Sequence, residues 1–258
     1  MSFELTVLGC SGSGPSRTVP ASGYLLRSAT TSIWMDAGTG TFMALAQLID
    51  PIHLDAVVIS HIHPDHCTDL FGYFHHLAYR RRVTASRPVY VAPGAIEWFA
   101  GFVEADQDHV FRGLLELNEV GEGDTATVGD LGLRFAETEH SVPCVATRIE
   151  DGDGSLVYSG DTGPGGGFSA LATGADVVLC EAGLVGSRDN TTYPLHLSGG
   201  EAADIAQAAG ARRLILTHLA PMMPVDAILA EARARFAGPV EAASPGMVVS
   251  VPSPGAER

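Results

Sequence analysis

Lysine is missing from this sequence of 258 residues, so all 15 basic side chains are arginines, against 30 acidic residues and a net charge of −15. The acidic balance argues against broad, charge-driven binding to nucleic acid or anionic membranes. No apolar run reaches the roughly 18 residues that a membrane-spanning helix needs. We therefore expect no membrane partner.

Cysteine is scarce, and no C-x-x-C pair occurs among Cys10, Cys67, Cys144 and Cys180. The N-terminal residues MSFELTVLGC alternate between apolar and polar, which is typical of a strand and not of a secretory signal. We therefore expect a cytoplasmic protein with buried thiols and no disulfide framework. Cys67 directly follows a cluster of histidines, which makes contact with a metal a weaker alternative for this thiol.

The arginines are concentrated at one place, where Arg80, Arg81, Arg82 and Arg87 fall within eight positions. Such a cluster is typical of the solvated end of a helix. The alternative is a local docking site for a phosphate.

A hydrophobic content of 46% and the absence of any shift in composition favour one large core. We therefore expect a single domain over residues 1–258. Its segments alternate between strand and helix patterns. Strands are expected at 3–8, 23–28, 32–36, 55–60, 88–92, 114–119, 125–128, 131–138, 144–150, 155–160, 177–180 and 213–217, and helices at 40–49, 67–81, 94–105, 199–209 and 225–236.

Local signals support several of these elements. The DGDG sequence at 151–154 predicts a hairpin turn, since Gly and Asp tolerate positive φ. Ser198 and Glu201 have the spacing of a capping box at the start of helix 199–209. Long β segments in both halves, interleaved with helices, predict an α/β fold of two packed sheets with helices outside.

Residues 60–69, SHIHPDHCTD, contain the strongest chemical signal. His61, His63, Asp65 and His66 follow an apolar strand and precede a helix, so a tight loop can aim all four inward. Imidazole suits zinc and related metals, and a carboxylate adds charge compensation. A surface cluster of polar residues is the alternative, but it does not explain three histidines beside an acid after a buried strand.

Three more candidates follow predicted strands, namely His140, Asp161 and His218. The carboxyl ends of strands are where α/β folds usually place their sites. Each of these residues alone is commonly a capping or packing residue. Together with the first four they supply seven ligands, which are enough for two metal ions about 3.5–4 Å apart.

The H-x-H-x-D-H run resembles the signature of the metallo-β-lactamase superfamily, and the similarity extends over nearly the whole chain. The resemblance implies a four-layer αββα metallo-β-lactamase sandwich, with Asp36 as a structural acid behind the metals. It assigns His61, His63 and His140 to one metal and Asp65, His66 and His218 to the other, bridged by Asp161. It also implies that the metals are two divalent ions, zinc or else manganese or iron.

The opening TVLGCSGSGPS is similar to that of ribonuclease Z-type proteins. Glu181, 20 positions after Asp161, and His196, 15 positions later, resemble the accessory pair of the ribonuclease Z-like phosphodiesterases. The resemblance implies that His196 donates a proton to the leaving group and that Glu181 orients its ring. Asp65 is expected to act in catalysis as well as in metal binding. The alternative is that His196 caps helix 199–209 and that Glu181 is a strand-end acid.

The sequence departs from bacterial ribonuclease Z between His140 and Asp161. Only 21 positions separate them, and the hairpin around DGDG accounts for nearly all, so the long arm that grips tRNA has no room. We therefore expect a dinuclear phosphodiesterase acting on small, including cyclic, phosphodiesters. The first alternative is an armless tRNA 3′ endonuclease with RNA as partner, the second a thioester or lactone hydrolase, and the last a non-enzymatic scaffold. By analogy with this branch, we expect a homodimer.

Overall fold

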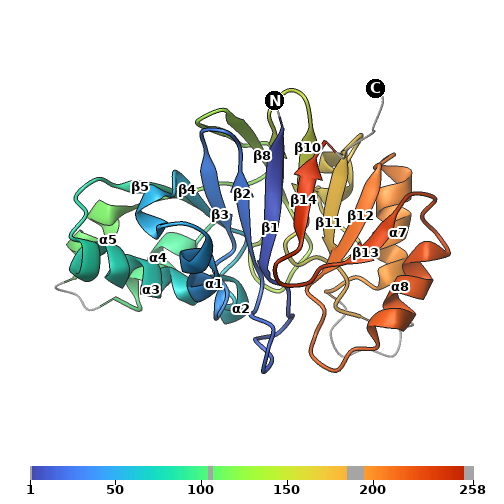
Figure 1. Cartoon of the computed structure of the whole chain (residues 1–258), viewed down its shortest axis with the longest axis horizontal. Helices are drawn as coiled ribbons and strands as arrows, with labels where there is room; N and C mark the ends of the chain where they lie inside the picture. The colour runs from blue at the N-terminus through green and yellow to red at the C-terminus, as the bar shows by residue number, and fades with distance from the viewer. Residues whose placement is uncertain (1, 104–106, 185–194, 253–258) are drawn as a thin grey trace.

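The computed structural model describes residues 2–103, 107–184 and 195–252. Within these ranges the chain forms two seven-stranded sheets that face each other, with helices on the outer side of each (Figure 1). The expected αββα sandwich is confirmed. No helix in this described part is long and apolar enough to cross a bilayer.

The first sheet joins the N-terminal strands to the last strand of the chain. Its spatial order is β14 (Val248–Val251), β1 (Phe3–Gly9), β2 (Gly23–Arg27), β3 (Ser32–Met35), β4 (Ala56–Ile59), β5 (Arg87–Val91) and β6 (Leu115–Glu119). Strands β14 to β3 pair antiparallel, and β3 to β6 pair parallel.

The second sheet repeats this mixture of pairings. Its spatial order is β13 (Val240–Ala242), β12 (Arg213–Thr217), β11 (Val177–Glu181), β10 (Ser155–Tyr158), β9 (Val145–Glu150), β8 (Leu131–Glu137) and β7 (Thr125–Val128). Strands β7 to β10 pair antiparallel, and β10 to β13 pair parallel.

The helices divide between the two outer faces. Those beside the first sheet are α1 (Thr41–Leu48), the 3₁₀ turn η1 (Pro51–His53), α2 (Pro64–Cys67), α3 (Asp69–His75), the π-helical segment η2 (His76–Arg81), α4 (Ala95–Ala100) and α5 (Asp108–Leu114). Those beside the second sheet are α6 (Phe168–Leu171), α7 (Gly199–Ala208) and α8 (Val225–Arg233).

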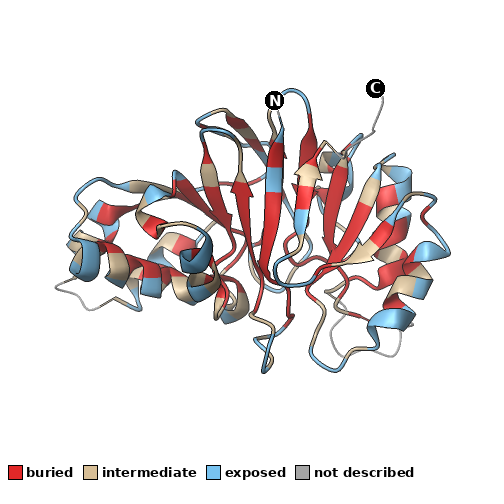
Figure 2. Ribbon diagram, viewed as in Figure 1, coloured by how far each residue is buried: buried red, intermediate tan, exposed pale blue. Residues whose placement is uncertain are grey.

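Apolar residues alternate between core layers along each strand. In β4, Ala56 and Val58 face the core between the sheets, whereas Val57 and Ile59 belong to the core under the helices of the first sheet. Figure 2 shows that most strand residues are buried, whereas exposed residues are concentrated in the loops and on the helices. All four residues of β4 are buried, so the prediction that this strand is buried on both faces is confirmed. Burial of each Val or Ile side chain contributes roughly 1.5–3 kcal/mol to the free energy of folding.

Strand direction places the candidate residues at one edge of the sandwich. Strands β10, β11 and β12 are parallel, and β8 runs the same way because both β8 and β10 are antiparallel to β9. In the first sheet β3 and β4 are parallel. The segments that follow these carboxyl ends therefore meet, as open α/β sheets require for a ligand site.

Several local predictions are confirmed and others need correction. The DGDG turn joins β9 to β10, and Ser198 and Glu201 form the capping box of α7. The helix predicted at 67–81 begins earlier, at Pro64, because proline is favourable in the first helical turn. It also divides into α2, α3 and η2.

The segments α5, α6, β13 and β14 were not predicted. They are short, and their pairing and packing are set by distant parts of the chain. The helix predicted at 94–105 ends at Ala100, and residues 104–106 lie outside the described part.

Candidate metal centre

The segment after β4 supplies four of the candidate ligands. His61 follows the strand and is fully buried, and His63 occupies the N-cap position of α2. Pro64 then begins the helix, so Asp65 and His66 lie within its first turns. The expectation of a loop holding all four is corrected here, because a short helix turns two of them toward the other sheet.

Three ring nitrogens converge in what we term the first ligand group, His61, His63 and His140 with Asp161. His63 Nδ1 lies 3.0 Å from His61 Nε2 and 3.1 Å from His140 Nε2. Nitrogens bound to a tetrahedral zinc at about 2.0–2.1 Å would lie roughly 3.3–3.4 Å apart. A cation fits this arrangement because it satisfies all three lone pairs, whereas one proton satisfies only one pair of nitrogens.

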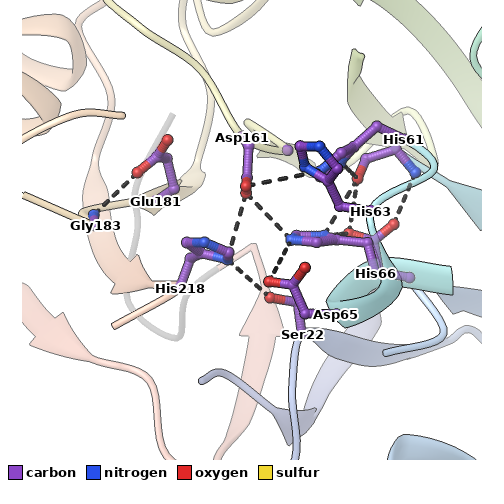
Figure 3. Close-up of polar contacts among 12 residues, drawn as sticks. Ser22, His61, His63, Asp65, His66, Asp161, Glu181, Gly183 and His218 are labelled. Atoms are coloured by element: carbon purple, nitrogen blue, oxygen red, sulfur yellow. Dashed lines mark hydrogen bonds and ion pairs between the residues drawn. The ribbon is translucent and has the colours of Figure 1, made fainter. Parts of the chain in front are cut away.

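The second ligand group, Asp65, His66 and His218, approaches the same carboxylate from the other side. Asp161 Oδ1 lies 3.3 Å from His66 Nε2 and 3.3 Å from His218 Nδ1, and Figure 3 shows it between these two rings. His66 Nε2 and Asp161 Oδ1 are buried without a hydrogen-bond partner. Buried polar atoms of this kind are rare unless an ion or water occupies the space between them.

Asp36 lies behind the second group and fixes His66. Its Oδ2 accepts hydrogen bonds from His66 Nδ1 at 2.7 Å, from Tyr158 OH at 2.7 Å and from Ser60 Oγ at 2.9 Å. Its Oδ1 accepts from Ser60 N at 2.7 Å. With Nδ1 bonded to a carboxylate, His66 directs Nε2 at the centre, which is the usual second-shell arrangement of a metal-binding histidine.

Two non-glycine residues at the centre have left-handed backbone conformations, Asp36 with φ 56° and His218 with φ 54°. Such conformations cost of order 1–3 kcal/mol and are retained where the surroundings impose them. At Gly12 a Cβ atom would lie 2.5 Å from the His218 carbonyl oxygen and 2.8 Å from its ring. Only glycine therefore allows the loop after β1 to lie directly against His218.

Glu181 and His196 form a buried pair beside the ligand groups. Glu181 ends β11, is fully buried, and its Oε1 lies 2.9 Å from His196 Nδ1. Its two oxygens also accept hydrogen bonds from the backbone N–H groups of Thr162, Gly183 and Leu197. His196 Nδ1 lies 3.9 Å from Asp161 Oδ2, so the pair adjoins the carboxylate of Asp161.

The electrostatics separate the histidines into two classes. Burial lowers the pKa of His140 to about 4 and those of His61 and His218 well below the ordinary value, with the neighbouring rings adding to the effect. These rings are neutral at pH 7, as metal ligands must be.

His66 and His196 shift in the opposite direction. Burial alone would lower the pKa of His66, but Asp161 and Asp36 raise it to about 10. Burial also opposes the charged form of His196, but Glu181 raises the pKa of its ring to about 9. Burial raises the pKa of Asp161 to about 7, against the attraction of His66.

A cavity of about 500 Å³, here called the metal cavity, opens over both ligand groups. It is lined by Ser13, His63, Pro64, Asp65, His140, Ser141, Asp161, Leu195, His196 and His218. His61, His66, Asp161 and His218 are buried, whereas His63, Asp65 and His140 are partly exposed. A small ligand in the cavity can therefore reach candidate ligands of both groups.

The structure brings all seven candidate ligands and the Glu181–His196 pair to one place. Cys67 instead donates to the Ile62 carbonyl at 3.3 Å, and in the described residues no metal-competent group includes it. The four thiols are free and buried.

The structure of the arginine cluster favours the first of its two interpretations, the solvated end of a helix. Arg80, Arg81 and Arg82 are exposed, and Arg81 pairs with Asp50 at 2.9 Å. Arg87 donates to the Ile52 carbonyl at 2.8 Å.

Sequence reasoning missed the supporting residues Ser13, Ser22, Ser60 and Tyr158. Ser22 Oγ lies 3.2 Å from His218 Nδ1, and Tyr158 reaches Asp36 from a position 122 residues away. Ser60 directly precedes His61 in the segment 60–69, and Ser13 lies in the opening TVLGCSGSGPS, so these two stand in segments that the sequence had already singled out.

Comparison with known proteins identifies relatives of the whole chain. Residues 18–219 match a family model described as a beta-lactamase superfamily domain. The Mycobacterium tuberculosis protein Rv1339 is 36% identical over 94% of this chain and 90% of its own length. A ribonuclease Z of Brevibacillus brevis is 27% identical over 90% of this chain and 92% of its own.

A solved structure supports the same relationship. The probable metallo-hydrolase YhfI of Bacillus subtilis is 31% identical over 95% of this chain and 99% of its own length. Its crystal structure matches 96% of this chain with a TM-score of 0.86.

Proposed function

The chain belongs to the beta-lactamase superfamily, and from this premise we propose that it is a dinuclear phosphodiesterase that hydrolyses small, including cyclic, phosphodiesters. The observation that carries the proposal is the Glu181–His196 pair, 2.9 Å between Oε1 and Nδ1, beside the shared carboxylate of Asp161. Hydrolysis of a phosphodiester needs a proton for the departing alkoxide, and a histidine held by a buried carboxylate can supply one.

The residues fit two divalent ions, and we propose zinc. Three nitrogens and Asp161 would hold the first ion, and Asp65, His66, His218 and Asp161 the second. Bound ions of this kind activate a water and neutralise phosphate oxygens.

The remaining roles belong to side chains of this protein. Asp65 faces the metal cavity and is positioned to orient the attacking water and to accept its hydrogen bond. As the water oxygen bonds to phosphorus and the bond to the leaving oxygen breaks, His196 gives a proton to that oxygen. The water loses one proton to the solvent, and His196 regains one from the solvent. The products are an alcohol and a phosphate monoester, which in the case of a cyclic diester are parts of one molecule. Glu181 holds the His196 ring and compensates its positive charge.

Substrate size follows from the connection between His140 and Asp161. In the described structure this connection consists of β9, β10 and short turns, with no inserted arm. With a net charge of −15, the surface disfavours a polyanion. We therefore propose that small diesters are cleaved with a higher kcat/KM than precursor tRNA.

The extent of the domain, the oligomeric state and the cellular compartment are also part of the proposal. We propose a single hydrolase domain over residues 1–258 that acts as a homodimer. Four free thiols are consistent with the reducing cytoplasm.

The test is a panel assay of the metal-loaded protein on bis(p-nitrophenyl) phosphate, cyclic nucleotides, precursor tRNA, S-lactoylglutathione and a lactone, combined with His196→Ala. This variant should retain its metal and lose roughly 10²–10⁴ in kcat on a cyclic nucleotide. The loss should be smaller on bis(p-nitrophenyl) phosphate, whose leaving group needs no proton. Glu181→Gln should lower kcat in the same direction but more mildly.

Preferred turnover of precursor tRNA would support the armless endonuclease, and thioester or lactone turnover would support the other hydrolases. Loss of metal in His196→Ala, or equal losses on both diesters, would return His196 to a structural role.

A further inference from the structure

A glycine-rich segment follows Asp161 and leads to helix α6. Its residues 163–167 read GPGGG and are called here the glycine loop, in which Gly166 has a φ of 82°. Glycine loses more conformational entropy on folding than any other residue, so a loop of this composition needs contacts that fix it. Those contacts are made with the end of β8, directly before His140.

The backbone of the glycine loop lies along the end of β8. Two hydrogen bonds of 2.7 Å join them, from Gly163 N to the Glu139 carbonyl oxygen and from Gly167 N to the Glu137 carbonyl oxygen. Thr138 forms a β-bridge with Gly166, and its hydroxyl donates to the Asp161 carbonyl oxygen at 2.8 Å. The segment that starts at Asp161 is therefore attached to the segment that ends at His140.

This attachment joins two strands that do not pair with each other. In the second sheet β9 lies between β8 and β10, so the strand ladder connects their ends only indirectly. His140 follows β8 and Asp161 follows β10, and both belong to the first ligand group. His140 Nε2 lies 3.9 Å from Asp161 Oδ2. The glycine loop thus supplies a direct connection between two members of one ligand group.

The side chain of Glu139 completes the connection. Its Oε2 accepts a hydrogen bond from Gly165 N at 2.8 Å. A Cβ atom at Gly163 would lie 2.6 Å from this oxygen, and one at Gly165 would lie 2.8 Å from it. The glycines therefore allow the loop to close around the Glu139 carboxylate. A hydrogen bond to a carboxylate is stronger than one between neutral groups, which suits it to fixing a flexible loop.

We propose that Glu139 is a positioning residue, which through the glycine loop holds His140 and Asp161 in the arrangement that an ion in the first ligand group requires. The inference rests on the proposed function, since that function places an ion there. Glu139 is not among the described residues that line the metal cavity, so its action goes through the loop and not through contact with a substrate.

Three variants of the full chain test this role. Glu139→Ala removes the acceptor for Gly165 N, whereas Glu139→Gln removes the charge but keeps an oxygen that can accept the bond. Glu137→Ala is the matched control. Glu137 is also an exposed glutamate at the end of β8, but it bonds to the loop through its carbonyl oxygen, which the substitution retains.

Competition of Zn²⁺ with a chelating dye measures the affinities, and the binding step that His63→Ala removes identifies the first ligand group. Glu139→Ala should weaken that step by roughly tenfold, the lower end of the range for outer-shell partners. Glu139→Gln and Glu137→Ala should stay close to wild type.

Cobalt substitution adds a readout that a change in stability alone does not move. The visible absorption of bound Co²⁺ reports the geometry of its ligands. The spectrum of Glu139→Ala should differ from that of the wild type, and Glu139→Gln should restore it. Chemical denaturation of the metal-free variants checks that each is folded.

The outcomes separate this role from the proposed function. Equal losses of affinity in Glu139→Ala and Glu139→Gln, or an equal loss in Glu137→Ala, would assign the effect to charge and overturn the positioning role. Wild-type affinity and spectrum in Glu139→Ala would overturn it too, as would a metal-free Glu139→Ala protein that is unfolded. In all these cases the proposed function stands. A wild-type protein that binds no Zn²⁺ overturns the proposed function and the positioning role together.

Discussion

The two ligand groups around Asp161 are supported in different ways. In the second group His66 is fully buried and bonded to Asp36, which itself accepts four hydrogen bonds. In the first group His63 and His140 are partly exposed, and His140 Nδ1 lies 3.3 Å from the backbone carbonyl of Leu195. His66 is thus built into the core between the sheets, whereas His63 and His140 lie at the mouth of the metal cavity. The difference implies that metal binding and fold stability are coupled at His66 and largely separate at His63 and His140.

Removing the residue common to both groups should have the largest effect. Asp161→Ala removes a carboxylate that serves both groups, and without it two cations would repel each other uncompensated. We expect both ions to be lost, and activity to fall by more than the roughly 10–100-fold typical of losing a second-shell partner. Elemental analysis and kcat on a small diester measure the two effects. Retention of two ions per chain would refute the bridging role.

His66→Ala and His63→Ala test directly whether the two groups differ in their contribution to stability. Both should abolish activity, but only His66→Ala leaves the buried Asp36 without one of its partners, at a cost of about 1–3 kcal/mol in the free energy of unfolding. His63→Ala should leave the metal-free protein close to wild type in stability. Chemical denaturation of both variants in the presence of a chelator makes the measurement. Equal losses of stability would show that the two groups are supported alike.

Tyr158→Phe sharpens the comparison without touching a candidate ligand. It removes the hydroxyl that donates to Asp36 Oδ2 at 2.7 Å, and with it part of the hold on His66. We expect weaker binding of one metal ion by roughly 10–100-fold.

Tyr24→Phe is the matched control, since Tyr24 is equally buried and packs 5.1 Å from Tyr158, but its hydroxyl bonds to Thr217. Competition with a chelating dye measures both affinities. Equal losses in the two variants would indicate a general packing effect.

Proton release on metal binding is the smallest effect and separates the groups without mutation. The pKa of His66 is raised to about 10, so its ring is charged below that pH in the metal-free protein, whereas His140, with a pKa of about 4, is neutral. A metal ion that engages His66 must expel a proton, so affinity for that ion should rise with pH up to about 10. Titration calorimetry at a pH between the pKa of Asp161, about 7, and that of His66, about 10, counts the protons in buffers of different ionisation enthalpy, because Asp161 is then already ionised. Uptake of the second ion without proton release would contradict this.

The layers of the fold and the meeting of the candidate ligands could be predicted from the sequence. His61, His140, Asp161 and His218 each follow an apolar strand, and strand ends of common direction meet at one edge. The contact of Tyr158 with Asp36 has no local signal, since it depends on two sheets packing face to face. Strands β13 and β14 were missed for the same reason, because their order is set by pairing with β12 and β1. The start of the helix at Pro64 could have been predicted from the sequence, since proline is favoured in the first turn of a helix.

The turn between β9 and β10 has a consequence for how the chain can be enlarged. Strand β9 starts beside Ser60, whose carbonyl accepts from Val145 N, and β10 returns to the same edge, so the turn lies at the far end of both strands. Gly152 and Asp153 in it are exposed. A fluorescent label or an inserted peptide placed there would point away from the metal cavity. An insertion in the segment 141–144 would instead emerge beside His140. An insertion in the turn would therefore allow labelling without altering the site, whereas an insertion at 141–144 would alter which substrates can enter the metal cavity.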